Sequence, residues 1–558
     1  MTNKQIARRL KETADLIELT GGNPHRARAY SSAARAVETS EPSVADLARD
    51  NALEGMSGIG AKLAADIATL ATQGSFALRD ELLQAIPPGL PEILRVKGLG
   101  VKKVHALWKT LGITTTDDLV LAAESGRLSE LPGFGAKTAE KVVEQARLVI
   151  SFRGKRHYYG AFIEAATFLD ELRAGGARAQ LVGEMRRKME TVSEIGILVD
   201  GDLTKASAAL RPYLSSEEET GDGEVLRGSL PDGLSLVVYG TKAERFGTDL
   251  FRLTGNETHL ATVADRLTEL PTAAEEADIY AAAGLAAVPP ELREGRDEIV
   301  LAAANRLPAL IEVSDLRGSV HNHSTWSDGA NTIEEMGEAA RHQGLEYFAL
   351  CDHSRSLQIA NGLSIDDLLR QRKEIDTLNE RYSADGIDFR VLAGTECDIL
   401  QDGSLDFPNE ILTDLDLVVA SVHTHFGMRV EEATERIIRA ISNPYVDILG
   451  HPTGRLLLRR PGYPIDHSAV IAACAAHNVA IELNANPYRL DMDWRFIEEA
   501  TAAGVKIAIN PDAHSVEELD YMSWGVAVAR KGGLRSDQCL NAMDLSALLG
   551  WLKARRPS

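Results

Sequence analysis

The hydrophobic pattern changes several times along the chain. Over residues 1–150, apolar positions recur at helical spacing between short Gly- or Pro-containing turns, which predicts an almost wholly helical region. Between about residues 178 and 260, the runs AQLVGEM, EIGILVDG and LSLVVYG predict a mixed α/β domain. Residues 261–300 are again helical in pattern, and strands alternate with helices from residue 315 to the end. The pattern therefore predicts a multidomain α/β protein.

Seven short apolar runs in the last third each end in polar or ligand-type residues. In order, they are GSVHNH, YFALCDH, RVLAGTE, LVVASVHTH, VDILGHP, VAIELNAN and VKIAINPDAH. In a barrel of parallel strands, the residues at the C-terminal ends of different strands converge on one site. Six of the runs supply candidate metal ligands, namely His321 and His323 (with Asp328 in the following loop), His353, Glu396, His423, His451, Asp512 and His514.

The number and type of these candidates indicate a cluster of metal ions. His321 and His323 point to the same face of a strand because side chains alternate with period two, and the same holds for Asp512 and His514. Mixed imidazole and carboxylate ligands favour zinc, manganese or iron over calcium or magnesium. Nine candidates exceed the needs of one tetrahedral ion, so two or three ions are predicted, with Glu396 as a bridging ligand.

Other histidines carry less weight. His342, His467 and His477 are interpreted as ordinary core or surface residues, and the role of His425 stays open.

Three similar Gly-x-Gly turns interrupt the N-terminal helices. They contain Gly58 and Gly60, Gly98 and Gly100, and Gly133 and Gly135, and each is followed by a lysine: Lys62, Lys102 and Lys137. Glycine permits positive φ and close approach of a phosphate, while a new helix presents free N–H groups to the anion. These turns resemble helix-hairpin-helix elements, which implies contact with the DNA backbone without sequence readout. The alternative is that the glycines only form tight helix–helix turns.

The strand-end motifs resemble a known family. GSVHNHSTWSDG, LCDHS, AGTECDI, ASVHTH, ILGHPTGR and INPDAHS are similar to the successive motifs of the PHP (polymerase and histidinol phosphatase) domain, and all nine of its ligand positions are occupied here. The resemblance implies a distorted (β/α)7 barrel with three metals. It assigns His321, His323, Glu396 and Asp512 to one ion, Glu396, His423 and His451 to a second, and Asp328, His353 and His514 to a third.

Such ions activate water and stabilise charge on phosphate oxygens, so the barrel is predicted to be a phosphoesterase. Glu396 and Asp512 are predicted to be catalytic through the metals. Arg455 and Arg459, shortly after His451, are candidates for clamping the substrate phosphate, with ordinary surface or salt-bridge roles as the alternative.

The first 310 residues are similar to the core of X-family DNA polymerases, from RAYSSAARAVE through TGNETH to PPELREG. That family carries G-S-x-R-R-G and three aspartates in its palm. Here the first motif reads Gly-Glu-Met-Arg-Arg-Lys at residues 183–188, the D-x-D position reads Glu194-Ile195-Gly196, and the third aspartate aligns with Ser235. Because two magnesium ions need those carboxylates, we expect a catalytically silent palm. Asp66 stands where some members carry a lyase lysine, so that activity is not expected either.

These features predict five segments. They are a helical domain at 1–90 with the first hairpin, a fingers-like hairpin domain at 91–150, a degenerate palm at 151–260, a thumb-like segment at 261–312 and the PHP barrel at 315–558.

The cysteine content indicates a cellular compartment, and the charge is unevenly distributed along the chain. The four cysteines form no CxxC pair, which fits a reducing cytoplasm, and neither a signal peptide nor a membrane helix is expected. Residues 1–150 hold 19 Lys and Arg against 18 Asp and Glu, so the net charge of −22 arises in the remainder of the chain. A nearly neutral region with local lysines is compatible with DNA as the partner, and no obligate protein partner is predicted.

The sequence therefore predicts a DNA-binding, repair-type protein. Its barrel would hydrolyse 3′ phosphodiesters as a 3′–5′ exonuclease or 3′-end phosphatase, with cleavage at abasic sites as a close variant. The alternatives are an active polymerase using Glu194, a small-molecule phosphatase of the histidinol-phosphate type, and a non-enzymatic DNA scaffold with structural metals.

Overall fold

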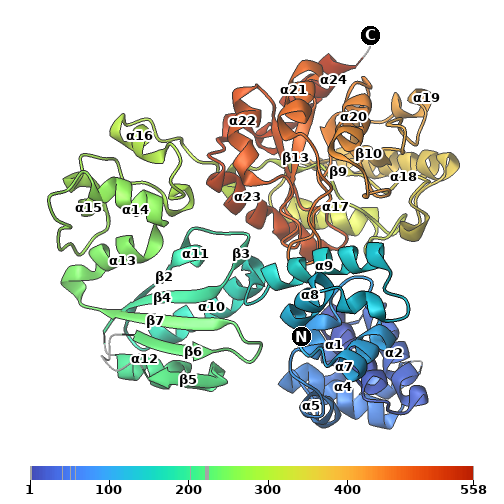
Figure 1. Ribbon diagram of the computed structural model, residues 1–558. Coiled ribbons are helices and arrows are strands. Elements are labelled where there is room, and N and C mark those ends of the chain that lie inside the picture. The colour runs from blue at the N-terminus through green and yellow to red at the C-terminus, as the bar shows by residue number, and fades with distance from the viewer. Residues whose placement is uncertain are drawn as a thin grey trace. The chain divides into compact units, whose positions relative to one another are not determined.

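The computed structural model describes residues 3–40, 42–50, 52–56, 58–201, 203–219 and 225–556. Ser57, which opens the first Gly-x-Gly turn, lies outside the described residues. The chain divides into two compact units, Met1–Arg153 and Gly154–Ser558 (Figure 1). The finer division into five segments stays a prediction.

The first unit is helical. Its helices are α1 (Asn3–Leu19), α2 (Pro24–Glu38), α3 (Val44–Arg49), α4 (Ala61–Gln73), α5 (Ala77–Gln84), α6 (Leu90–Ile93), α7 (Val101–Leu111), α8 (Thr116–Glu124) and α9 (Ala136–Ser151). Local signals set the helix starts: Asn23 caps α2, which begins with a proline, and Thr115 and Asp118 form a capping box on α8. One core packs α1 to α4, and a second packs α6 to α9.

The second unit begins with a five-stranded sheet. Its elements are β1 (Arg156–His157), α10 (Tyr158–Ala174), β2 (Arg178–Val182), α11 (Gly183–Arg186), β3 (Thr191–Val192), β4 (Glu194–Asp200), α12 (Leu203–Leu210), β5 (Ser216–Glu219), β6 (Val225–Ser229) and β7 (Ser235–Thr241). The strand order is β2-β4-β7-β6-β5, with only β4 and β7 parallel among the described pairs, while β1 pairs with β3. Helices α10 and α12 pack on the main core of this sheet.

A small helical segment follows, made of α13 (Phe246–Thr254), α14 (Glu257–Ala264), α15 (Ala277–Ala282) and α16 (Glu298–Ala303). Its core encloses a hydrogen-bonded group: His259 lies 2.8 Å from both the Glu298 carboxylate and the Tyr280 hydroxyl. All three side chains are buried, so the network fixes the packing of α14 on α16.

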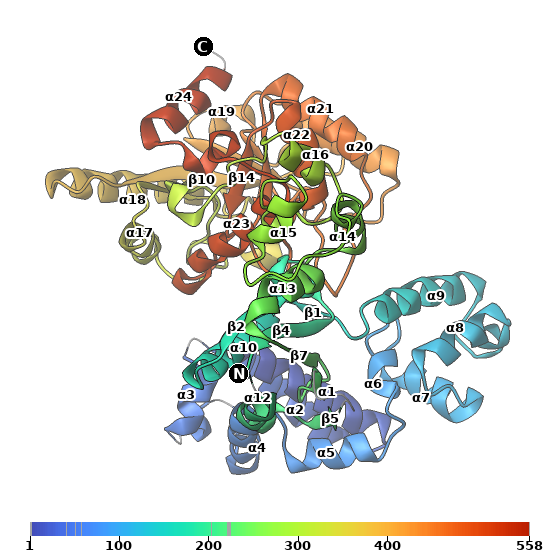
Figure 2. The same ribbon diagram turned by 90° about the vertical axis from the view of Figure 1, so that its left-hand side faces the viewer.

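The rest of the unit is a barrel of parallel strands surrounded by helices (Figures 1 and 2). Its strands are β8 (Gly318–Ser319), β9 (Tyr347–Leu350), β10 (Arg390–Asp398), β11 (Leu417–Ser421), β12 (Ile448–Leu449), β13 (Ala480–Asn484) and β14 (Ile507–Asn510). Its helices are α17 (Ile333–His342), α18 (Ile365–Ala384), α19 (Asn409–Leu412), α20 (Val430–Ile441), α21 (His467–His477), α22 (Ile497–Ala502), α23 (Met522–Lys531) and α24 (Leu545–Arg555).

The strands are ordered β14-β13-β12-β11-β10-β9-β8. A bridge between Asn322 and Ala513 joins the chain after the first strand to the chain after the last, so the barrel is nearly closed. Leu548 and Leu552 of α24 pack into the interior with Leu417 and Ile448, which fills the end of the barrel away from the strand C-termini. The predicted fold class, including the seven-stranded barrel, is confirmed.

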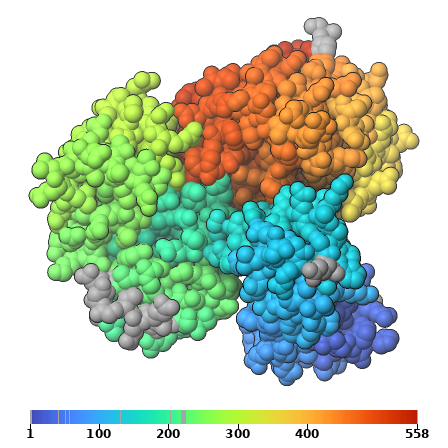
Figure 3. All heavy atoms as spheres, in the orientation of Figure 1, coloured from blue at the N-terminus to red at the C-terminus, as the bar shows by residue number. Residues whose placement is uncertain are grey.

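The palm-like sheet and the barrel share a packed boundary within the second unit. Tyr158 and Phe162 of α10 lie edge-on to Trp524 of α23, with ring centroids 5.8 and 5.4 Å apart. Lys531, also on α23, is 2% exposed and donates to the Arg187 carbonyl at 3.2 Å. In the space-filling view, the barrel residues (yellow to red) form one continuous body (Figure 3). Among the described residues, no helix is long and apolar enough to span a bilayer.

Candidate metal centre

The candidate ligands lie where the barrel strands end. Glu396 belongs to β10, and the others follow β8, β9, β11, β12 and β14 within a few residues, except Asp328, which sits further along the loop after β8. This end of a parallel barrel gathers side chains from successive strands into one site. The sequence distance between the first and last candidates is therefore no obstacle to direct contact.

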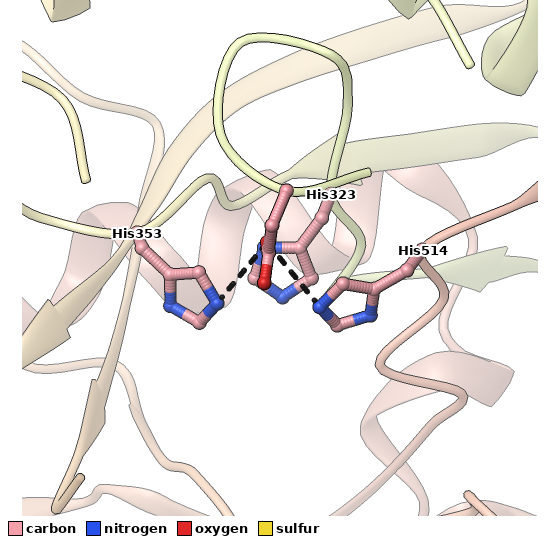
Figure 4. A group of neighbouring side chains, drawn as sticks. His323, His353 and His514 are labelled. Carbon is pink, nitrogen blue, oxygen red and sulfur yellow. Dashed lines mark ion pairs between the residues drawn. The ribbon is translucent and has the colours of Figure 1, made fainter. Parts of the chain in front are cut away.

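Four of the candidates surround one point. His323, Asp328, His353 and His514 offer ligand atoms that all lie within 4.8 Å of one another. Asp328 Oδ1 is 3.4 Å from Nε2 of both His353 and His514. The His323 ring stacks on the other two rings, with centroids 4.4 and 4.2 Å away. Figure 4 shows the three imidazoles turned toward one another.

Glu396 is the carboxylate that the imidazoles share. Its Oε1 lies 2.9 Å from His451 Nε2 and 3.3 Å from His423 Nε2. Its Oε2 lies 2.7 Å from His353 Nδ1, and His321 Nε2 approaches Oε1 to 3.5 Å. Glu396 is 1% exposed, so these imidazoles replace water around the carboxylate. This arrangement suits a bridging ligand.

Asp512 forms a further group with the two histidines after β8. Its Oδ1 lies 3.0 Å from His323 Nε2 and 3.7 Å from His321 Nε2. His323 and His353 each belong to two of the three close groups, whereas the family resemblance divides the ligands into sets that share only Glu396. His451 lies outside these groups despite its contact with Glu396. The assignment of residues to individual ions therefore stays a prediction.

The charges of the centre are mutually stabilising. Burial alone would raise the pKa of Glu396, but His423, His321 and His353 hold it well below its ordinary range. Asp512 behaves in the same way: burial raises its pKa, and the nearby imidazoles lower it well below the usual value. Both carboxylates are therefore anions at neutral pH, as a cation site requires.

Buried polar atoms give an independent test of whether metal ions fit. His321 Nε2, His323 Nδ1 and both carboxylate oxygens of Glu396 are buried, and among the described residues none forms a hydrogen bond, although imidazole nitrogens lie close to the Glu396 oxygens. Such groups are rare in folded proteins because an unsatisfied buried polar atom is costly. Their donor set of imidazole nitrogens and carboxylate oxygens matches the ligands of zinc, manganese or iron. The residues present therefore fit divalent transition metals.

Sequence reasoning missed the carboxylates that orient the imidazoles. Glu482 of β13 is fully buried and lies 2.7 Å from His321 Nδ1, and Asp398 at the end of β10 contacts His423 Nδ1. Each accepts the proton of one ring nitrogen, which leaves Nε2 free to bind a metal. The run VAIELNAN contains no predicted ligand. Its single acid, Glu482, within an otherwise apolar strand was the one sequence signal of this role.

Arg455 is bound within the barrel. Its Nε donates to the Arg489 carbonyl at 3.0 Å, and its Nη1 lies 3.0 Å from Asp493 Oδ2. Glu190 of the palm-like domain lies 3.7 Å from Nη2. The guanidinium therefore ties the loop after β12 to the loop after β13, and a contact with phosphate stays a prediction.

The residues aligned with the polymerase motifs lie on the five-stranded sheet and on or just after α11. Glu194 of β4 pairs in register with Ser235 of β7, so the aligned carboxylate positions face each other across neighbouring strands. Glu184 accepts hydrogen bonds from the Ser193 amide and hydroxyl at 2.7 and 2.8 Å. Arg186 forms a two-bond contact with Glu276. Glu184 and Arg186 of the motif are thus held by partners outside it.

The three Gly-x-Gly turns share one geometry. Gly58, Gly98 and Gly133 have φ values of 81°, 91° and 86°, which a side chain disfavours. The middle residues Ile59, Leu99 and Phe134 are buried. The second glycines, Gly60, Gly100 and Gly135, cap α4, α7 and α9, and an added Cβ would meet nothing within 4 Å. Lys62, Lys102 and Lys137 are exposed. Each helix start therefore presents its N–H groups on an open surface.

Comparisons with known proteins agree with this architecture. Residues 1–76 match the helix-hairpin-helix domain, residues 90–148 match the SAM-like helix-hairpin-helix tandem, and residues 319–486 match the PHP domain. The DNA polymerase/3′-5′ exonuclease PolX of Bacillus subtilis (strain 168) is 34% identical over 577 residues, covering 99% of this chain and all of that protein. A probable phosphatase of Thermoanaerobacter sp. (strain X514) is 30% identical over 247 residues, covering 42% of this chain and 94% of the phosphatase.

Helix-hairpin-helix modules joined to a PHP barrel define a multidomain protein with a hydrolase domain and modules of a DNA-binding type. Within that class, the chain belongs to the DNA polymerase X family.

Proposed function

We propose that this protein is a metal-dependent phosphodiesterase that processes 3′ ends of DNA, with a 3′–5′ exonuclease reaction preferred. The observation that carries the proposal is the buried Glu396, whose two oxygens meet imidazoles contributed by four different strand ends. The exonuclease named in the Bacillus subtilis relative supports the choice of reaction.

The nine candidate ligands would hold two or three divalent ions, zinc or manganese or iron. When bound, the ions supply an activated water and stabilise charge on the phosphate. Glu482 and Asp398 keep protons on Nδ1 of His321 and His423, so both rings present Nε2 to the centre. Asp328 and His514 have side chains 33% and 32% exposed, whereas those of His321 and His323 are fully buried. We infer that substrate enters past Asp328 and His514.

The palm is proposed to be catalytically silent. Of the aligned carboxylate positions, only Glu194 keeps an acid; burial and Glu184 raise its pKa, while Arg227 opposes them. A metal pair for nucleotidyl transfer needs several ionised carboxylates. The lyase position is unfavourable as well, because Asp66 accepts a hydrogen bond from Tyr30 and carries no amine.

DNA ends, nicks or gaps would be held by the three Gly-x-Gly turns and their lysines through the phosphate backbone. The four cysteines are buried and free, which supports a reducing, cytoplasmic compartment.

A second candidate is a small-molecule phosphatase. The probable phosphatases that match only part of this chain favour it, since one from Acetivibrio thermocellus is 32% identical over 203 residues, or 35% of this chain and 78% of that protein. Such an enzyme would need neither the hairpin modules nor the palm.

One experiment separates the candidates. A 5′-labelled strand in a gapped duplex is incubated with Mn²⁺, with and without dNTPs, using wild type, His321→Ala/His323→Ala and Glu194→Ala. The proposal expects shortening by wild type and by Glu194→Ala, and none by the double histidine variant. Strand extension that requires Glu194 would contradict the silent palm, and hydrolysis of phosphomonoesters without shortening of DNA would favour the phosphatase.

A further inference from the structure

Three arginines and two aromatic residues gather on the loops that follow β11, β12 and β13. They are Phe426, Arg459, Arg460, Tyr488 and Arg489, and we call them the arginine–aromatic patch. The patch begins at the metal centre, because Arg489 Nε lies 3.8 Å from Asp512 Oδ2. It lies in the part of the chain that carries the net negative charge, so its local positive charge is distinctive.

The arginines crowd one another. Burial and the charges of Arg489 and Arg459 lower the pKa of Arg460, while Asp491 opposes them, so the three guanidinium groups repel one another with partial compensation. Among the described residues, no carboxylate lies within ion-pair distance of Arg459 or Arg460. Arg460 instead lies over the Phe426 ring at 4.5 Å and donates to the Gly454 carbonyl at 3.2 Å. A bound polyanion would relieve this repulsion.

The backbone of the patch is held in place. Leu458 and Leu490 have φ values of 56° and 44°, a region that side chains of this size disfavour. Leu456 and Arg460 form an antiparallel bridge, and the Leu457 amide donates to the Tyr488 carbonyl at 2.8 Å. The two loops therefore present Arg460 and Tyr488 together, with little ordering left to occur on binding.

The aromatic groups offer flat surfaces beside the cations. Tyr488 is 43% exposed, and its ring packs edge-to-face with the ring of His157, with ring centroids 4.9 Å apart. Phe426 backs the Arg460 guanidinium, which fixes the orientation of that plane. Aromatic rings and guanidinium planes next to phosphate-binding cations are the features that bind unpaired nucleic-acid strands.

We propose that the arginine–aromatic patch binds the single DNA strand whose end is in the metal centre. Arg489 would contact the phosphate at the centre, Arg459 and Arg460 the following backbone phosphates, and Tyr488 and the Arg460 plane the unstacked bases. The inference rests on the proposed function, and it adds that substrate must be a strand long enough to cross the patch. A small phosphate ester would reach Arg489 alone.

The test compares two substrates with the full-length protein in Mn²⁺. One is a 5′-labelled single-stranded oligonucleotide and the other is bis(p-nitrophenyl) phosphate. For Arg460→Ala, we expect the KM for the oligonucleotide to rise about tenfold, with a much smaller effect on the small diester. Arg460→Lys should recover part of the loss because it keeps the charge. Arg390→Ala, an exposed arginine where β10 begins at the other end of the barrel, is the matched control.

A second readout excludes a purely structural effect. The affinity of the labelled strand, measured by anisotropy, should depend less steeply on salt in Arg460→Ala, by about 0.7 in the log–log slope for one lost phosphate contact. Equal losses on both substrates, or an unchanged KM and salt slope, would overturn the proposal. If wild type hydrolysed neither substrate, the proposed function would fail, and the anisotropy series alone would still decide the patch.

Discussion

At the scale of single residues, the centre depends on which nitrogen of each imidazole carries a proton. The carboxylate of Glu482 accepts the Nδ1 proton of His321, and that of Asp398 accepts the Nδ1 proton of His423. When neutral, both rings are thereby held in the tautomer that leaves Nε2 unprotonated. A metal ligand held in one tautomer and one ring orientation binds its ion more tightly than a free one. These two acids touch no substrate in our proposal, but they orient the imidazoles that would hold the metal ions.

Glu482→Gln should weaken metal binding by roughly tenfold to a hundredfold, because the neutral amide no longer raises the basicity of His321. Competition with a chromophoric chelator measures the affinity. Glu431→Gln, an exposed acid on α20, should bind metal as wild type does. Equal affinities in the Glu482 variant and wild type would show that Glu482 is only a packing residue.

Metal binding should release protons. Burial lowers the pKa of His423 and His514, but Glu396 and Asp398 raise the first to about 10, and Asp328 and Asp512 raise the second to about 9. In the metal-free protein, both rings are therefore protonated at pH 7, and each must lose its proton to coordinate an ion.

The apparent metal affinity should consequently fall as the pH falls from about 9 toward 6. Calorimetric titration of EDTA-treated protein in two buffers with different ionisation enthalpies counts the released protons. A binding enthalpy that is the same in both buffers would contradict the expectation.

Much of the site, but not all of it, could be predicted at this scale. Imidazoles and acids at strand ends are uncommon enough to be visible in a single sequence, so the nine candidates were found. Glu482 was not, because one acid within an apolar strand has no local partner in the sequence; its partner His321 lies 161 positions away. The contacts of Arg455 depend on the Arg489 carbonyl and on Asp493, which lie 34 and 38 positions away along the chain, so no local pattern reveals them.

At the scale of elements, the two glycines of each Gly-x-Gly turn have different roles. The first has positive φ and forms the turn, the residue between them is buried, and the second begins a helix with open space where a side chain would stand. The turn therefore needs glycine at the first position for its own conformation. At the second position, glycine leaves the surface clear for a phosphate.

Gly98→Ala and Gly100→Ala should therefore fail in different ways. Gly98→Ala places a side chain at φ 91° and should destabilise the helical unit by about 1 to 2 kcal/mol, which thermal denaturation measures. Gly100→Ala should leave the melting temperature close to that of wild type and weaken DNA binding severalfold. Equal DNA affinities for wild type and Gly100→Ala would argue that α7 does not contact DNA.

The barrel strands were predictable as elements because each is a short apolar run followed by polar residues. In the palm, the runs that form β2, β4 and β7 stood out, but β6 did not, because its sequence VLRGS has an exposed arginine and a glycine. It becomes a strand through its pairing with β7, and that tertiary contribution is invisible to a local pattern.

At the scale of the whole molecule, the palm-like domain is joined to its neighbours by buried charges. Arg187 of the motif pairs with Glu294 at 2.9 Å, and Glu294 also contacts Lys531 of the barrel helix α23. Lys531 lies 4.7 Å from the centre of the Trp494 ring. A buried charge network thus joins the palm, the thumb-like segment and the barrel, so we expect the second unit to unfold as one body.

Lys531→Ala should reduce the stability of the second unit by roughly 3 kcal/mol, because it leaves Glu294 partly unpaired in a buried position. Urea denaturation followed by tryptophan fluorescence measures the change, since Trp494 adjoins the substitution. Lys553→Ala, an exposed lysine on α24, should have no such effect. The double variant Glu294→Gln/Lys531→Met should recover much of the loss, and a failure to do so would point to packing instead of charge.

The metal centre is not shielded evenly. The side chains of Asp328 and His514 are about one third accessible, while those of His321, His323 and Glu396 are sealed inside. An ion at the outer position would exchange with the surroundings far faster than its inner neighbours. The protein would then retain its inner ions through purification and lose the outer one, so its turnover would follow the free metal concentration of the medium.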